Sequence, residues 1–170
     1  TEMTVPAFWA GGKKWGARFA SQKTGIYRFR TECSDNSDAG LHGREGSFKV
    51  TAYKGRNPLF RHGPVHVAAD KRHFAHADGT PFLWLGDTWW MGLTRRLSWP
   101  QGFRILAADR VRKGFTVVQI VAGLYPDMPA FDRRGANEAG FPWTEKFERI
   151  NPRYFDMADR RIQHLVDSGL

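Results

Sequence analysis

The residues best suited to chemistry are Asp87, Trp89 and Trp90, a carboxylate and two indoles that follow an apolar run at residues 82–85. A short run of Leu and aromatic residues after a turn signal predicts a strand buried on both faces, which is typical of parallel sheets. In (β/α) folds, the residues just past the C-terminal end of a strand build the active site. We therefore expect Asp87, Trp89 and Trp90 to lie where a substrate binds.

The pattern after residue 85 changes to a helical period. Ser98 and Gln101 form a capping-box pattern with Pro100 in the first turn, so we expect a helix to begin there. Its expected apolar face is Phe103, Leu106, Ala107 and Val111, and Gly114 suits the position after its end.

Residues 115–121 predict a second buried strand, followed by a long loop to about Asn151. The next helix is expected to bury one stripe, formed by Phe155, Ala158, Ile162, Leu165 and Val166, and to stop at Gly169. Strand, helix, strand and helix make two successive βα units.

The N-terminal part has a period of two instead. Apolar positions alternate in three stretches, Trp15/Ala17/Phe19, Tyr27/Phe29/Thr31 and Phe48/Val50/Ala52. These predict three antiparallel strands, whose apolar face needs a second sheet to cover it, as in a β-sandwich. Asn57-Pro58 and Gly63-Pro64 indicate a linker, and the Asp78-Gly79 turn predicts a hairpin between residues 73–77 and 82–85.

Composition limits the classes of protein to which the chain can belong. Its 170 residues leave room for about one and a half domains, and 41% hydrophobic residues suffice for a packed core. No apolar run approaches the ~18 residues that span a bilayer, so no membrane partner is expected. Residues 1–5 resemble neither an initiator start nor a signal peptide, so we expect a longer chain. The single Cys33 cannot form an internal disulfide, and we interpret it as a structural thiol.

The formal net charge of +9 raises the question of an anionic partner. The basic residues are scattered in ones and twos, as at Lys13-Lys14 and Arg95-Arg96, without a basic block or a recognition-helix pattern. A solvated surface accounts for them best. Anionic polysaccharide or nucleic acid is the second interpretation of the charge, and among these partners we expect no nucleic acid.

Several segments together resemble a known family. They are residues 78–90 (DGTPFLWLGDTWW), 114–119 (GFTVVQ) and 125–127 (YPD), with 5–12 (VPAFWAGG), Trp15, 40–43 (GLHG) and 46–48 (GSF) upstream. The downstream segments are similar to the opening of the apiosidase-like glycoside hydrolases, which are (β/α)8 barrels. The upstream segments resemble the small β-sandwich that commonly precedes this barrel.

The resemblance implies a fold class of α/β plus all-β. Residues 1–56 would form a partial β-sandwich, and residues 57–170 the first two βα units of a truncated TIM barrel. It also implies hydrolysis of glycosidic bonds in plant-type or microbial polysaccharides by two carboxylates, without a cofactor. In such barrels these carboxylates follow the fourth and seventh strands, so the catalytic residues are expected after Leu170. The alternative is a non-catalytic carbohydrate-binding or scaffold protein that keeps the barrel.

Six residues are candidates for substrate binding: Asp87, Trp89, Trp90, Tyr125, Asp127 and Trp143. Flat C–H faces of sugar rings stack on aromatic side chains. Trp89 and Trp90 should point in opposite directions, so we expect one at the mouth of the site and one in the core. Asp87 and Asp127 follow neighbouring strands, and a catalytic pair of these two carboxylates is a less favoured possibility. Asn137 and Glu138, in the long second loop, are weaker candidates.

The histidines do not predict a metal site. His73 and His76 are three residues apart on an expected strand and therefore face opposite sides. Neither a Gly-rich phosphate loop nor a nucleophile elbow is present in the sequence. Compartment, whether bacterial cytoplasmic or secreted, and oligomeric state stay open.

Overall fold

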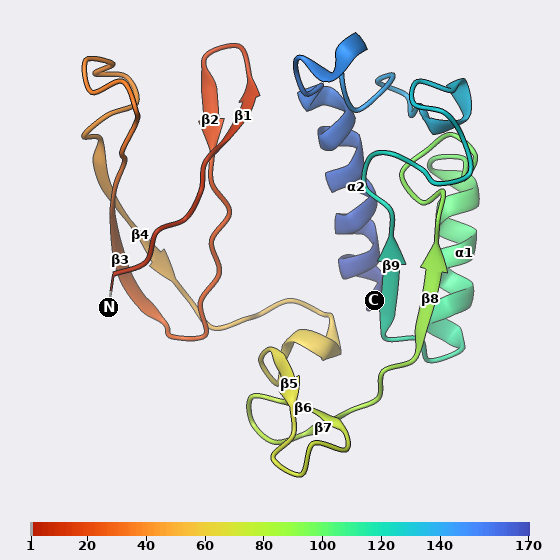
Figure 1. Ribbon diagram of the computed structural model, residues 1–170. Coiled ribbons are helices and arrows are strands. Elements are labelled where there is room, and N and C mark those ends of the chain that lie inside the picture. Colours follow the sequence, from red (N-terminus) through yellow and green to blue (C-terminus); the bar gives the residue numbers. More distant parts are fainter. Residues whose placement is uncertain (1) are drawn as a thin grey trace. The chain divides into compact units, whose positions relative to one another are not determined.

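The computed structural model describes residues 2–170 and shows a mixed α/β chain (Figure 1). The chain forms two compact units: Arg18–Lys54, and Gly55–Leu170 together with the N-terminal residues through Ala17. This division differs from the domain boundary expected between residues 56 and 57, which stays a prediction.

Two parallel strands carry the two expected βα units. β8 (Gly86–Trp89) leads into α1 (Gln101–Arg112), and β9 (Val117–Ile120) leads through a long loop into α2 (Pro152–Ser168). β8 and β9 run in the same direction, as the arrows in Figure 1 show. The predicted order of strand, helix, strand and helix is confirmed.

Both helices cover the same face of the β8–β9 pair. The main buried cluster consists of Trp89 from β8, Phe103 and Ala107 from α1, and Leu165 from α2. A second cluster joins Leu93 to Tyr154 and Ala158 of α2. The opposite face of the two strands has no such cover among residues 2–170, since Gly86, Thr88 and Gln119 are exposed there.

α1 begins and ends close to the predicted residues. Pro100 is the N-cap, without a side-chain capping bond, so the expected role of Ser98 as the cap is wrong. The Ser98 hydroxyl still accepts a hydrogen bond from the backbone N–H of Gly102 at 3.2 Å, which satisfies one free donor of the first turn. Gly114 follows the helix with φ +76°, a left-handed conformation that glycine adopts without strain.

α2 ends at Gly169, as predicted, with φ +103°. The expected apolar stripe is partly wrong. The buried residues are Tyr154, Ala158, Arg161 and Leu165, whereas Ile162 is 46% exposed. The steps of four, three and four residues keep the buried set on one face of the helix. The buried face therefore includes an arginine, Arg161, that the expected stripe left out.

The apolar run at residues 82–85 does not form one strand, which corrects the prediction for this segment. Phe82 ends β7 (Pro81–Phe82), the partner of β6 (Phe74–His76), and β8 begins only at Gly86. Leu83 is 69% exposed, and the Trp84 ring packs on Phe74 with centroids 4.9 Å apart. The run is divided because Phe82 is paired in the hairpin while the backbone of Leu85 already bonds Thr116 before β9.

A three-stranded antiparallel sheet precedes the βα units. β5 (Val65–Val67) pairs with β6, and β6 with β7, so the hairpin predicted around Asp78-Gly79 is confirmed up to Phe82. A 3-10 turn, Pro58–Phe60, lies upstream. Asn57 before it is 2% exposed and donates to the backbone carbonyls of Val166 and Leu170, which ties the expected linker to α2.

The N-terminal strands form two separate hairpins. β1 (Phe8–Gly11) pairs with β2 (Lys14–Gly16), and in the second unit β3 (Gly25–Arg30) pairs with β4 (Glu45–Val50). The expected first strand through residue 19 is therefore wrong. Phe19 instead packs on the aromatic face of β3 and β4, formed with Tyr27, Phe29 and Phe48. The sandwich itself stays a prediction.

Candidate functional site

The C-terminal ends of β8 and β9 lie at the same edge, because the parallel register places Trp89 beside Ile120. The loop after β8 and the long loop after β9 both leave from this edge, and the backbone N–H of Arg95 bonds the carbonyl of Ala136 at 3.0 Å. The long loop contains two 3-10 turns, Arg133–Gly135 and Glu145–Phe147. The loops that carry the predicted binding residues are thus in direct contact.

Asp87 lies inside β8 and not past its end, and its side chain faces α1. Its Oδ2 accepts hydrogen bonds from Arg110 Nε and, at 2.9 Å, from Trp89 Nε1. Burial acts to raise the pKa of Asp87, but the bonds from Arg110 and Trp89 outweigh it and hold the pKa below its usual value. Asp87 therefore stays ionised at neutral pH, which suits an anchor for α1 and not a general acid.

The two neighbouring indoles divide between core and surface. Trp89 is 5% exposed and meets Phe103 edge-on, with ring centroids 5.2 Å apart. Trp90, one residue past β8, is 52% exposed. The expected opposite orientation is confirmed, and Trp90 is the indole that a ligand can reach.

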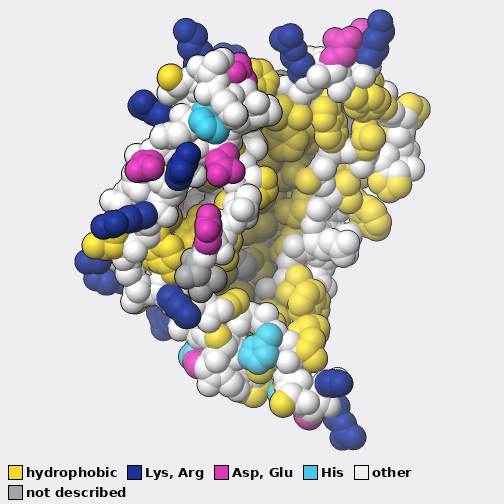
Figure 2. All heavy atoms as spheres, turned by 60° about the vertical axis from the view of Figure 1, so that its left-hand side comes forward, with side chains coloured by type: hydrophobic (Ala, Val, Ile, Leu, Met, Phe, Trp, Pro, Cys, Tyr) yellow, Lys and Arg dark blue, Asp and Glu magenta, His cyan; other side chains and the backbone are white. Residues whose placement is uncertain are grey.

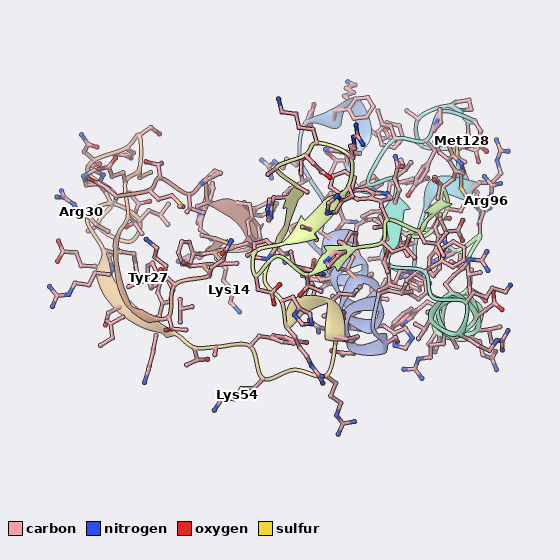
Figure 3. The ribbon with its side chains drawn as sticks, turned by 90° about the horizontal axis from the view of Figure 1, so that it is seen from below. Lys14, Tyr27, Arg30, Lys54, Arg96 and Met128 are labelled. Carbon is pink, nitrogen blue, oxygen red and sulfur yellow. The ribbon has the colours of Figure 1, made fainter. Side chains whose placement is uncertain are left out.

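Asp127 belongs to the surface of the second loop. Its Oδ2 accepts a hydrogen bond from Arg96 Nη1 at 2.9 Å, with both side chains about two-fifths exposed. Arg96, labelled in Figure 3, comes from the loop after β8, so this ion pair joins it to the loop after β9. Asp87 and Asp127 are each held by a different arginine, Arg110 and Arg96, so the geometry provides no shared proton or common site for the two carboxylates.

Tyr125 and Trp143 shape the second loop from within. Tyr125 is 6% exposed, its hydroxyl lies 2.9 Å from that of Tyr154, and burial raises its pKa. Trp143 is half-buried over Gly123, which has φ +130°, and a Cβ at Gly123 would lie 2.5 Å from the indole. Only glycine fits there, and its absent side chain is what lets the indole approach the backbone.

Sequence reasoning missed a buried polar network beneath this loop. Arg161 is fully buried, donates from Nη2 to Glu138 Oε1 at 3.0 Å, and stacks 5.2 Å from the ring centroid of Trp99. Asn137, also fully buried, donates to the backbone carbonyl of Tyr154 at 3.1 Å. Burial acts to raise the pKa of Glu138, but Arg161 outweighs it and keeps the pKa low. Asn137 and Glu138 therefore hold the loop to α2.

A second missed feature is a polar pair on the open face of the sheet. Thr88 and Gln119 are register partners on β8 and β9 and are both exposed. They line a hollow together with Trp84, Gly86, Asp87 and Val117. Strand alternation around Asp87 and Trp89 is the signal that could have found them.

Three histidines that precede β8 have partners within residues 62–80. His73 pairs with Asp70 at 3.2 Å, His62 with Asp78 at 2.7 Å, and His76 Nδ1 lies 2.8 Å from the carbonyl of Gly63. Among residues 2–170, no group of three or more His, Cys, Asp or Glu side chains has the arrangement of a metal site.

In the same part of the chain, no helix is long and apolar enough to cross a membrane. Figure 2 shows Lys and Arg side chains scattered over the visible face without one basic block.

Comparison with known proteins agrees with the sequence resemblance. The model of the apiosidase-like catalytic domain matches residues 68–170, and that of a domain of unknown function, DUF5060, matches residues 1–34. No protein of curated function matches the chain.

Two solved structures match the chain at low identity. A provisionally classified glycoside hydrolase from Bacteroides vulgatus ATCC 8482 is 24% identical with a TM-score of 0.65, over 98% of this chain and 32% of that one. A family 5 glycoside hydrolase from the same organism is 23% identical with a TM-score of 0.49, over 66% of this chain and 24% of that one. The chain thus spans about a third or less of these structures. Because the catalytic-domain model matches more than half of its residues, the chain belongs to the apiosidase-like family of glycoside hydrolases.

Proposed function

We propose that this chain is part of an enzyme that hydrolyses glycosidic bonds in plant-type or microbial polysaccharides. The parallel β8–β9 pair, with α1 and α2 on one face, supports a (β/α)8 barrel, because every helix of such a barrel lies outside its strands. Residues 57–170 would then form the start of the barrel and residues 1–56 part of the preceding β-sandwich.

Three carboxylates near the two loops were candidates for the site, and their surroundings bear on the mechanism. Asp87, Asp127 and Glu138 are each paired with an arginine, and the pKa values of Asp87 and Glu138 are lowered, whereas a general acid needs a raised one. These three carboxylates are therefore poor candidates for the acid/base and nucleophilic roles, and we propose that the catalytic carboxylates follow Leu170, as the family resemblance implies. The described residues would bind the substrate and support the site.

Among the six candidates, the geometry favours three for direct contact with a sugar. Trp90, Asp127 and Trp143 have accessible surface at the loops that follow β8 and β9. The buried Trp89 and Tyr125 and the anchored Asp87 would act by shaping the loops beneath them.

The test is hydrolysis by the complete protein that carries this chain. Release of reducing sugars from a panel of plant and microbial polysaccharides, with chromatography of the products, should identify at least one substrate. Asp87→Asn and Asp127→Asn should lower this activity by about tenfold or less, as expected for binding or support. A loss beyond about a thousandfold in both variants would instead identify these carboxylates as the catalytic pair.

The alternative is a carbohydrate-binding or scaffold protein of the same fold. The exposed Trp90 favours it as much as it favours an enzyme, because stacking alone binds sugars. Retardation in native gels that contain the same polysaccharides, without release of reducing sugars, would support this alternative.

A further inference from the structure

We propose that Thr88 and Gln119 form a polar floor that hydrogen-bonds hydroxyl groups of the bound sugar. This inference rests on the proposed function, because it assumes that the open face of β8 and β9 becomes the interior of a barrel. It adds two sugar-binding residues to the site, from positions inside the strands and not from the loops.

The orientation of both side chains follows from their neighbours in the strands. Asp87 bonds Arg110 of α1, and Trp89 packs on Phe103, so Thr88 between them points to the opposite face. Val118 and Ile120 likewise pack against the helix-covered core, so Gln119 also points to the open face.

The two side chains are adjacent and free to bind a ligand. Thr88 and Gln119 are Cα partners in the parallel register, and both are exposed. Within residues 2–170, neither side chain makes a hydrogen bond. A hydroxyl and an amide together offer donors and acceptors that match the hydroxyl groups of a sugar.

Thr88 and Gln119 lie close to the C-terminal ends of β8 and β9, the end at which a barrel has its active site. The lower pair on the same face, Gly86 and Val117, is small or apolar, and the polar pair lies two residues closer to the C-terminal ends. The interior of a barrel is usually filled with branched apolar residues, and its active site lies at the C-terminal face. Polar side chains in the layer nearest that face are therefore better explained by a ligand than by packing.

The experiment uses the complete protein with Thr88→Val and Gln119→Leu, which remove the hydrogen-bonding groups at nearly constant volume. Gln101→Leu is the matched control, because Gln101 is exposed at the start of α1, away from this face. Affinity is measured from retardation in native gels that contain the panel of polysaccharides, together with kcat and KM for any polysaccharide that is hydrolysed and with melting temperatures.

We expect each of the two variants to weaken sugar binding by about threefold to tenfold, the loss of one or two hydrogen bonds, with melting temperatures close to that of the unchanged protein. Gln101→Leu should bind like the unchanged protein. Binding that depends on Thr88 and Gln119 without any hydrolysis would support the polar floor and overturn the proposed enzyme. Unchanged binding, or a lowered melting temperature with unchanged binding, would overturn the polar floor alone. Absence of both binding and hydrolysis would overturn both proposals.

Discussion

The ion pair between Arg161 and Glu138 should respond asymmetrically to removal of its two partners. Arg161 is fully buried, whereas the side chain of Glu138 is 34% exposed. Glu138→Ala leaves a fully buried guanidinium without its counter-ion. Its remaining contacts are a long bond of 3.4 Å from Nη1 to the Met157 carbonyl and the stacking on Trp99, and its Nε has no partner. Arg161→Met removes the buried charge and leaves a carboxylate that water can reach.

The two substitutions should therefore differ clearly in free energy. An uncompensated buried charge costs about 3–5 kcal/mol, whereas replacing a buried charge by a well-packed apolar side chain is often nearly neutral. We expect Glu138→Ala to destabilise α2 by about 3 kcal/mol and Arg161→Met by about 1 kcal/mol, since a thioether also packs well on Trp99. The difference of about 2 kcal/mol corresponds to roughly a thirtyfold change in local opening.

Hydrogen exchange of peptides from α2, measured by mass spectrometry on the complete protein, reports this local opening. Glu148→Ala is the matched control, because Glu148 is an exposed carboxylate in the same loop. Faster exchange in Arg161→Met than in Glu138→Ala, or equal exchange in the two, would refute the reasoning from buried charge. The double variant should exchange like Arg161→Met alone.

Three further predictions concern single residues. Trp90→Ala should weaken polysaccharide binding by about tenfold in affinity gels, with little change in melting temperature. Trp89→Ala should instead lower thermal stability by about 3–5 kcal/mol. The reverse outcome would show that Trp89 binds the sugar and that Trp90 belongs to the core. Gly123→Ala should destabilise the second loop by about 1–3 kcal/mol in thermal melts, because φ +130° and the overlying indole exclude a Cβ; an unchanged melting temperature would contradict this. Asp87→Asn should lower stability most above pH 4, because the folded-state pKa of Asp87 lies below the usual 3.8 and its contribution is lost as pH falls through that lowered pKa. A difference between Asp87→Asn and the unchanged protein that grows below pH 4 would show that the sign is wrong.

The sequence alone determined the elements that depend on local patterns. Periodicity of 3.6 located both helices to within a few residues, and glycines with positive φ stand after each of them, at Gly114 and Gly169. Turn signals located the hairpin at Asp78-Gly79. The conspicuous segment 78–90 was sufficient to indicate the family, because the combination of residues is specific even where each residue is common.

The tertiary structure decided which partner each side chain meets. The apolar pattern of residues 82–85 is compatible with one strand and with a run divided between two sheets. Hydrophobicity indicates that a residue is buried, but it does not indicate which strand it pairs with. Asp87 looked like a residue of the site, but the reach of Arg110 from α1 directs it to the helix-covered face. Arg161 could not be recognised as buried, because its burial depends on Glu138, 23 residues earlier in the chain, and on Trp99. Long-range pairing of charges is set by how the helices pack on the strands, and no local pattern in the sequence encodes it.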